Sequence, residues 1–307
     1  MAYIITWGKK TIGSKKSLLK SLAKKQLYRL EDFALYNDVG RNLSTWVYQS
    51  IFYTFIKEKL NDFRNIKILE EIKKNPVPKH IAIIMDGNRR FAHNIGLSSD
   101  AGHLFGRDKV EDVLEWCIEL GIKNLTLYAF STENFNRNPK EIERLMSICR
   151  NELIHALDDK RIQQHQVRVK VIGHIESLPT DVQDAAKNLM RQTKLHKKYN
   201  LTIALAYGGR EEIIRAIQNI ANDVKNNTLT INQIDEQKVS SYLYTTGLPD
   251  PDLILRTSGE ERISNFLLWQ MAYSEFYFSD VYWPALTKRE FLQAIQTFQM
   301  RKRRYGT

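Results

Sequence analysis

From about residue 78 onward, short apolar segments alternate with longer amphipathic ones, and this alternation restricts the fold more than any other feature of the chain. The apolar segments are rich in β-branched and aromatic residues, as strands buried on both faces should be. We expect strands at 80–85, 124–130, 167–172, 201–207 and 252–256. We expect helices at 106–120, 139–160, 179–198, 209–226, 232–245 and 287–303. This order predicts a single α/β domain whose central, largely parallel β-sheet is flanked by helices on both faces.

The residues that follow each strand are candidate site residues, because ligands of such sheets bind beyond the carboxyl ends of the strands. Four predicted strands are followed by arginine together with glycine, serine or asparagine: 86–90 (DGNRR), 131–137 (STENFNR), 207–210 (YGGR) and 256–262 (RTSGEER). Guanidinium groups, small hydroxyls and free backbone N–H groups are the donors that a multiply charged phosphate needs. Four such ends at one edge of a sheet favour a phosphate site over arginines that only pair with surface carboxylates.

Asp86 stands directly after the first predicted strand, close to two arginines. A carboxylate in that setting suits Mg²⁺, which takes one or two carboxylates and completes its shell with phosphate oxygens and water. Glu275 is a second candidate ligand. The alternative is that Asp86 caps a helix beginning near residue 88.

The formal charge of +11 and the pI near 9.4 suggest an anionic partner: nucleic acid, a phosphorylated substrate or an anionic membrane surface. A basic surface without a specific partner fits the charge equally well. Much of the excess lies at the two ends, in 9–25 and 301–304.

The chain has two cysteines, Cys117 and Cys149, each within a helical pattern. This argues against a zinc cluster or a disulfide scaffold and fits a reducing compartment. No segment approaches the roughly 18 apolar residues of a membrane span, and the N-terminus lacks the apolar core of a signal peptide. We therefore expect a cytoplasmic protein, with peripheral contact at a membrane surface as a further prediction.

Residues 1–76 differ from the rest and are predicted to form a basic, helical N-terminal extension, with the catalytic domain at 77–307. Pro76 and Pro78 mark the linker between them. The aromatic-rich segment 43–60 reads as an amphipathic helix that packs on the domain or, alternatively, faces lipid.

Several phosphate-handling folds are excluded by their missing motifs. The chain has no GxxxxGK[ST] segment, no GxGxxG after a strand and no DDxxD segment. The apolar stripe of 139–160 lies near Phe130, Phe135 and Leu205 in the predicted fold. Core packing explains such a set by default, whereas a cavity beside a diphosphate site would suit an isoprenoid chain.

The motifs HIAIIMDGNRRFA (80–92), GH (102–103), LTLYAFSTENFNR (125–137), AYGGREEI (206–213), RTSGEERISNFLLWQMAYSEFYF (256–278) and the terminal RRYG closely resemble the cis-prenyltransferases, the undecaprenyl and dehydrodolichyl diphosphate synthases. The resemblance covers about residues 77–307 and is nearest to archaeal or eukaryotic members. It implies one α/β domain with a hydrophobic tunnel, a homodimer, and repeated cis condensation of isopentenyl diphosphate onto an allylic prenyl diphosphate.

The resemblance also assigns roles to individual residues. Asp86 would assist ionisation of the allylic diphosphate through Mg²⁺, and Glu275 would support the metal or the dimer's site. Asn134 would assist proton removal, with Ser131 beside it at the reacting carbons. The diphosphate of the allylic substrate would be held by Gly87, Asn88, Arg90 and His103. Isopentenyl diphosphate would be bound by Arg256, Arg262 and Ser264, with Arg304 and Gly306 completing the partner's site. The same motifs add Arg89, Glu133, Phe135 and Arg137 to the substrate-binding candidates.

Three positions depart from the family pattern. Ser99 stands where many bacterial members have an arginine, so either the first diphosphate site is expected to be weaker or Arg89 is expected to supply the missing charge. Glu261 stands where bacterial sequences often have histidine, and Phe135 replaces a frequent tryptophan.

Two other functions compete with this interpretation. A nucleic-acid-binding protein would need basic residues on one surface with aromatic residues for stacking, whereas here the arginines stand among carboxylates. We therefore expect no nucleic-acid partner. A catalytically weak subunit of a prenyltransferase complex would have lost the first-motif aspartate, which this chain retains as Asp86.

Overall fold

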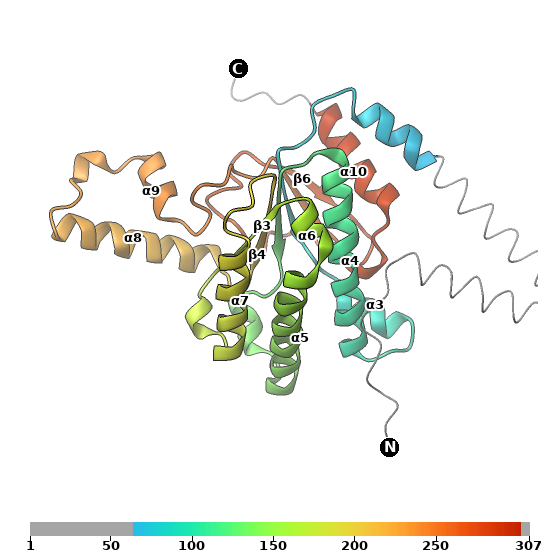
Figure 1. Cartoon of the computed structure of the whole chain (residues 1–307), viewed down its shortest axis with the longest axis horizontal. Coiled ribbons are helices and arrows are strands. Elements are labelled where there is room, and N and C mark those ends of the chain that lie inside the picture. The colour runs from blue at the N-terminus through green and yellow to red at the C-terminus, as the bar shows by residue number, and fades with distance from the viewer. Residues whose placement is uncertain (1–63, 302–307) are drawn as a thin grey trace, which may run out of the picture. The chain divides into compact units, whose positions relative to one another are not determined.

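The computed structural model describes residues 64–301, and these form an α/β fold around one six-stranded sheet (Figure 1). The strand order is β3-β4-β2-β1-β5-β6, and every neighbouring pair is parallel. The strands are β1 (His80–Ile84), β2 (Asn124–Tyr128), β3 (Val167–Ile172), β4 (Tyr199–Ala204), β5 (Leu253–Arg256) and β6 (Glu275–Phe278). The predicted fold class is confirmed, and all five predicted strands are present.

The helices confirm the predicted alternation and add to it. They are α3 (Asn88–Asn94), α4 (Ser99–Leu120), α5 (Pro139–Asp158), α6 (Lys160–Gln164), α7 (Thr180–Gln192), α8 (Gly209–Lys225), α9 (Glu236–Tyr242) and α10 (Lys288–Met300), with the short 3₁₀ segments η1 (Thr132–Asn136), η2 (Ile175–Ser177), η3 (Ile231–Gln233) and η4 (Trp283–Ala285). The helix α3 was considered only in the alternative that Asp86 caps a helix beginning near residue 88, and the strand β6 was not predicted. In Figure 1, α8 and α9 extend away from the sheet.

The two faces of the sheet carry different cores. Alternate residues of the strands, such as Ile81, Ile83 and Leu125, pack with α4, α5, α7 and α10 in the larger cluster. The opposite face is smaller and aromatic: Tyr128 stacks on Phe266, with 4.5 Å between ring centroids. Both faces are buried, as predicted, but the second is covered largely by the segment after β5 rather than by a layer of helices.

A compact unit begins at Lys67, and a helix at 64–72 leads into it. Leu69 and Ile72 belong to the larger core, and Gln299 of α10 donates a hydrogen bond from Nε2 to the Ile72 carbonyl at 2.9 Å. The predicted extension up to residue 63, including the aromatic segment 43–60, lies outside the described residues. Within residues 64–301, no helix has both the length and the hydropathy that crossing a membrane requires.

Candidate active site

Arginines gather at the carboxyl ends of β1 and β5, where the two strands lie side by side. The last residue of β5, Arg256, is only 3% exposed and connects the group. Its Nη2 lies 2.8 Å from Asp86 Oδ2, and its Nη1 donates to Ser264 Oγ at 2.8 Å and to the Arg262 carbonyl. We call the whole set the Arg256 cluster; its members are Asp86, Arg90, Arg256, Ser258, Glu260, Arg262 and Ser264.

Arg90 joins this cluster from α3. Its guanidinium contacts Ser258 Oγ at 2.6 Å, Glu260 Oε1 at 2.9 Å and Asp86 Oδ1 at 3.2 Å. Glu260 also pairs with Arg262, so one carboxylate holds two arginines. Sequence reasoning placed Arg90 with His103; the structure places it with the Arg256 cluster and reveals Glu260 as its partner. The arginine-rich motif contained Glu260, but nothing in its spacing indicated this contact.

Asp86 remains ionised at neutral pH. Burial alone would raise its pKa, but the hydrogen bond and the charge of Arg256, the backbone N–H of Gly87 and the charge of Arg90 together hold the pKa below its ordinary value. The side chain does not cap α3, because the capping position belongs to Gly87 and no side-chain cap bond is present. The helix-cap alternative is therefore wrong, and the carboxylate is left to interact with cations.

Gly87 allows the chain to turn from β1 into α3. Its φ of 96° lies in the left-handed region that favours glycine, and an added Cβ would lie 2.6 Å from Tyr282 Cδ1 and 2.9 Å from Ser258 Cβ. In the segment that follows β5, the non-glycine residues Ser258 (φ 78°), Ser264 (φ 47°) and Asn265 (φ 61°) also adopt positive φ. Such backbone is costly and gathers at functional sites.

Two arginines and a histidine converge on the first turn of α5. Glu141 Oε1 lies 3.0 Å from Arg137 Nη1 and 3.8 Å from His103 Nε2, and Oε2 lies 3.6 Å from Arg89 Nη1. We call these four residues the Glu141 cluster. Glu141 stood out in the sequence only as an acidic residue at a helix start. The structure brings Arg89, Arg137 and His103 together around it, while Ser99 contacts His93 at 3.1 Å and supplies no charge.

Two buried polar atoms between the clusters have no hydrogen-bond partner: Asn88 Oδ1 and His103 Nε2. The position of Asn88 depends on two glycines of α4, since a Cβ on Gly106 would lie 2.1 Å from Asn88 Oδ1 and one on Gly102 equally close to the Asn88 carbonyl oxygen. Burial lowers the pKa of His103, and Arg137 lowers it further while Glu141 opposes the shift. His103 is therefore neutral at pH 7, with one ring nitrogen free to bond to a ligand.

The segment η1 supplies a second group of predicted residues at the same edge. Asn134 Oδ1 accepts a hydrogen bond from the Ser131 backbone N–H at 3.1 Å, which fixes the start of η1. Glu133 Oε1 accepts from Asn265 Nδ2 at 2.8 Å and so links η1 to the loop that carries Ser264. Phe135 packs edge-on against Phe130, with 5.0 Å between centroids.

Glu275 is not brought to this edge. It opens β6 and pairs in register with Leu253, which pairs in turn with Ile81, so Glu275 lies about five residues, or about 16 Å, from the level of Asp86. Its carboxylate instead contacts Arg301 Nη1 at 2.6 Å. Asp86 and Glu275 of one chain therefore do not share an ion. Arg304 and Gly306 lie outside the described residues.

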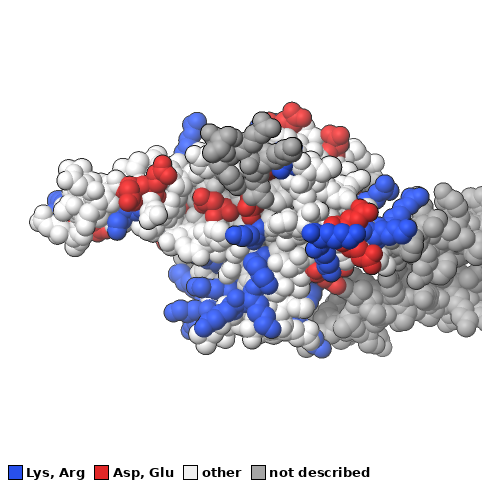
Figure 2. All heavy atoms as spheres, turned by 90° about the horizontal axis from the view of Figure 1, so that it is seen from above, with Lys and Arg blue, Asp and Glu red and all other residues white. Residues whose placement is uncertain are grey.

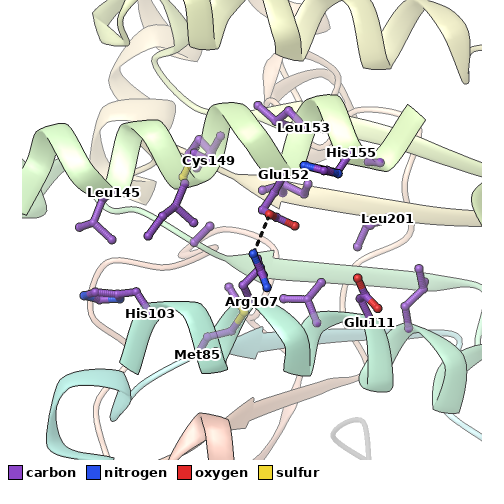
Figure 3. A pocket seen from close by; sticks show the side chains of 18 of the residues that line it. Met85, His103, Arg107, Glu111, Leu145, Cys149, Glu152, Leu153, His155 and Leu201 are labelled. Carbon is purple, nitrogen blue, oxygen red and sulfur yellow. Dashed lines mark ion pairs between the residues drawn. The ribbon is translucent and has the colours of Figure 1, made fainter. Parts of the chain in front are cut away.

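A cavity of about 230 Å³ lies beside the site, between α4 and α5 and against the sheet (Figure 3). Asn88, His103 and Met85 line one end, and Leu201, Ile162 and Asp159 line the other. Most of the wall is apolar, including Cys149, whose pKa burial raises to about 12. The predicted hydrophobic tunnel therefore has a counterpart that opens next to the polar residues.

The donor set at the sheet edge fits Mg²⁺ as a substrate-bridged ion. Among residues 64–301, no group of three or more His, Cys, Asp or Glu side chains is arranged to hold a metal. One ionised carboxylate, Asp86, stands among arginines that would hold phosphate. Mg²⁺ commonly takes one or two carboxylates and obtains its other ligands from substrate phosphates and water.

Comparison with known proteins agrees with this geometry. The family described as "Putative undecaprenyl diphosphate synthase" matches residues 84–306. A relative from Thermoplasma acidophilum, a tritrans,polycis-undecaprenyl-diphosphate synthase (geranylgeranyl-diphosphate specific), is 50% identical over 256 residues, which cover 82% of this chain and 99% of the relative.

Two solved structures share the fold. Lavandulyl diphosphate synthase from Lavandula x intermedia, in complex with dimethylallyl diphosphate, has a TM-score of 0.73 and 35% identity, covering 75% of this chain and 99% of that one. A "probable undecaprenyl diphosphate synthase" from Campylobacter jejuni has a TM-score of 0.62 and 35% identity, covering 76% and 100%. The chain belongs to the undecaprenyl diphosphate synthase family of cis-prenyltransferases.

Proposed function

We propose that this protein is a (2Z)-polyprenyl diphosphate synthase. It would condense isopentenyl diphosphate repeatedly onto an allylic diphosphate and make a long-chain cis-polyprenyl diphosphate, the precursor of a lipid glycan carrier. The observation that carries the proposal is the placement of two arginine clusters beside one apolar cavity, with His103 belonging both to the Glu141 cluster and to the cavity wall. Geranylgeranyl diphosphate is the first starter to test, because the Thermoplasma relative is named for it.

In each condensation, the allylic C–O bond breaks and the diphosphate leaves with the electron pair. The double bond of isopentenyl diphosphate attacks the allylic carbon, and a proton is then lost. The Arg256 cluster would hold one diphosphate, and Arg89, Arg137, His103 and the backbone at Gly87–Asn88 the other, so that the reacting carbons meet at η1 beside Ser131 and Asn134. When bound, Mg²⁺ supplies Lewis-acid stabilisation of the charge that develops on the leaving diphosphate. Asp86 would orient that ion, and the cavity would keep water from the reacting carbons.

We further propose that the active unit is a homodimer with peripheral membrane contact. The residues Arg304 and Gly306 of one copy would complete the isopentenyl diphosphate site of the other, and Glu275 would act at that subunit boundary. Light scattering during size-exclusion chromatography tests the dimer, and sedimentation with vesicles tests the membrane contact.

The observations do not favour the alternatives. Figure 2 shows Lys and Arg side chains in separate groups, one of them intermingled with Asp and Glu, rather than in a continuous basic stripe. Two carboxylates, Asp86 and Glu260, sit inside the Arg256 cluster and would repel a nucleic-acid backbone. The candidate catalytic residues of a silent subunit would be lost, whereas Asp86 and Asn134 are present here.

The test is an assay of the full chain with radiolabelled isopentenyl diphosphate, geranylgeranyl diphosphate and Mg²⁺. We expect chain-extended products whose new double bonds are cis, and loss of product when the metal is chelated. Absence of any condensation with geranylgeranyl, farnesyl or dimethylallyl diphosphate would overturn the proposed function.

A further inference from the structure

Charged and titratable side chains are among the residues that line the cavity, whereas most of the other lining residues are apolar. Arg107 and Glu111 come from α4, and Glu152 and His155 come from the facing helix, α5. Figure 3 shows Arg107 and Glu152 pointing toward each other across the space between the two helices.

The helical pattern makes Glu152 an exception. Leu145, Cys149, Leu153 and Ala156 recur at spacings of three and four on α5, and all four line the cavity. Glu152 falls on the same stripe, where this spacing predicts an apolar residue. The Glu152 side chain lines the cavity and is 35% exposed, so its charge is partly solvated.

Electrostatics and distance show that the contact is an ion pair without a hydrogen bond. Arg107 Nη1 lies 3.5 Å from Glu152 Oε1, whereas Arg107 Nη2 and Nε lie 2.6 Å and 2.9 Å from Asp108 of its own helix. Burial raises the pKa of Glu152, and the charges of Arg107 and His155 oppose this shift. The pair joins α4 to α5, but its long distance leaves it open to displacement.

The volume of the cavity indicates how much of an isoprenoid chain it covers while this pair is in place. A cavity of about 150 Å³ accommodates benzene, with six carbons. The 230 Å³ found here therefore holds roughly nine carbons, close to two isoprene units. A longer chain must pass the Arg107–Glu152 pair, which joins α4 to α5.

We propose that Arg107 and Glu152 form a length-determining gate in the cavity, which an isoprenoid chain must displace once it exceeds about two buried units. The inference rests on the proposed function, since only a growing chain would meet the gate during turnover. Arg107 and Glu152 are thus specificity-determining residues that touch the distal part of the substrate and not the reacting atoms.

The first measurement is binding and does not depend on catalysis. The Kd values of geraniol, farnesol and geranylgeraniol, with increasing numbers of isoprene units, are compared by quenching of intrinsic tryptophan fluorescence. In the natural protein we expect affinity to rise from geraniol to farnesol by less than about tenfold and then to level off, because the third and fourth units must displace the gate. In the double variant Arg107→Leu/Glu152→Leu, we expect each added unit to tighten binding by about tenfold or more.

The second measurement is product length by mass spectrometry, with geranylgeranyl diphosphate as starter. We expect the double variant to shift the main product to a greater length, with the rate of the first condensation changed less than about threefold, an effect as small as that of an exposed ion pair. The matched control is Arg144→Leu/Asp100→Leu, which removes another ion pair between α5 and α4, at 2.5 Å and outside the cavity wall. This control should keep both the levelling of affinity and the product length.

Identical alcohol affinities in the natural protein and in the folded double variant would overturn the gate. If the double variant does not fold, Glu152→Gln is the variant to test, because it keeps the shape of the side chain and removes its charge. Unchanged alcohol binding and unchanged product length in Glu152→Gln would also overturn the gate. If the natural protein shows the expected levelling of affinity for the alcohols but catalyses no condensation, the proposed function would be wrong and the gate would still be supported.

Discussion

The two arginine clusters at the sheet edge contain similar groups but are built differently. In the Arg256 cluster, three guanidiniums, one of them that of the buried Arg256, and two carboxylates form one connected set of contacts. In the Glu141 cluster, one carboxylate holds two guanidiniums and an imidazole at 3.0–3.8 Å. The first is a preorganised site, because contacts with the protein orient both Nη atoms of Arg256 and the guanidinium of Arg90. In the second, the Glu141 carboxylate occupies a position that a phosphate could take, so ligand binding there requires exchange of one anion for another.

The largest effect should come from Asp86, which only the Arg256 cluster contains. We expect Asp86→Asn to lower kcat by at least about a thousandfold, as does removal of a preorganised electrostatic group, and Asp86→Ala to abolish turnover. The measurement is the rate of isopentenyl diphosphate incorporation at saturating substrates, with circular dichroism as the control for folding. Natural activity in a folded Asp86→Ala protein would refute the assigned role.

Replacing Arg256 tests the preorganisation of that cluster. A lysine ammonium is a single point charge and cannot bridge Asp86, Ser264 and the Arg262 carbonyl together. We expect Arg256→Lys to lower kcat/KM for isopentenyl diphosphate by about 10- to 100-fold, the range for charged hydrogen bonds. The control is Arg262→Lys, whose side chain is 63% exposed and should lose less. Equal decreases of kcat/KM in the two variants would mean that the buried Arg256 contributes no more than the exposed Arg262.

Glu141→Gln tests whether the second cluster exchanges anions. The substitution leaves Arg89 and Arg137 without a competing carboxylate, so we expect KM for the allylic diphosphate to fall by about two- to fivefold, in line with partly exposed ion pairs. Glu143→Gln, two residues further along α5 on an exposed position, serves as the matched control. A rise in KM in Glu141→Gln alone would show that the carboxylate positions the cations instead of competing for them.

The smallest expected effect is that of pH on the free energy of unfolding, to which the two clusters should contribute unequally. Because the folded protein holds the pKa of His103 below its ordinary value of about 6.5, the neutral form is favoured by folding. The contribution of His103 to the free energy of unfolding should therefore be constant above about pH 6.5 and should decrease as the pH falls from there through the lowered pKa of His103.

Denaturant unfolding at a series of pH values measures this, and His103→Gln should show a shallower fall. Asp86 stays ionised over the same range, since its pKa lies below that of an ordinary aspartate. Buried His80, whose pKa is also lowered by burial, contributes equally to both proteins. Superimposable pH profiles for the natural protein and His103→Gln would contradict the expected contribution.

Much of this architecture could be predicted because its elements carry regular patterns. The five predicted strands are continuous apolar segments, and the strand-end rule placed Asp86, Arg256 and Ser131 at one edge. The start of α4 was predicted too late, at residue 106 instead of Ser99, because Gly102 and Gly106 are poor helix formers. They are present because α4 approaches Asn88 too closely for any side chain, which is a tertiary requirement.

The remaining differences are also tertiary. The strand β6 is half-exposed and only four residues long, so its sequence shows no clear alternation of apolar and polar residues. Because β6 was not predicted, the distance between Glu275 and Asp86 could not be predicted either. The cation-holding role of Glu141 depends on the packing of α3 and α4 against α5. Glu152 was not predicted as a site residue because it stands in an apolar stripe, a pattern that predicts core packing.

The cavity between α4 and α5 also has a thermodynamic consequence. It lies against the larger of the two cores, and the apolar side chains of its wall lack packing partners on the side that faces the cavity. An isoprenoid tail that fills it would complete the core, so the protein should melt at a higher temperature with bound product than without it. Release would then remove part of a hydrophobic core, and a lipid or detergent phase that accepts the tail should accelerate turnover.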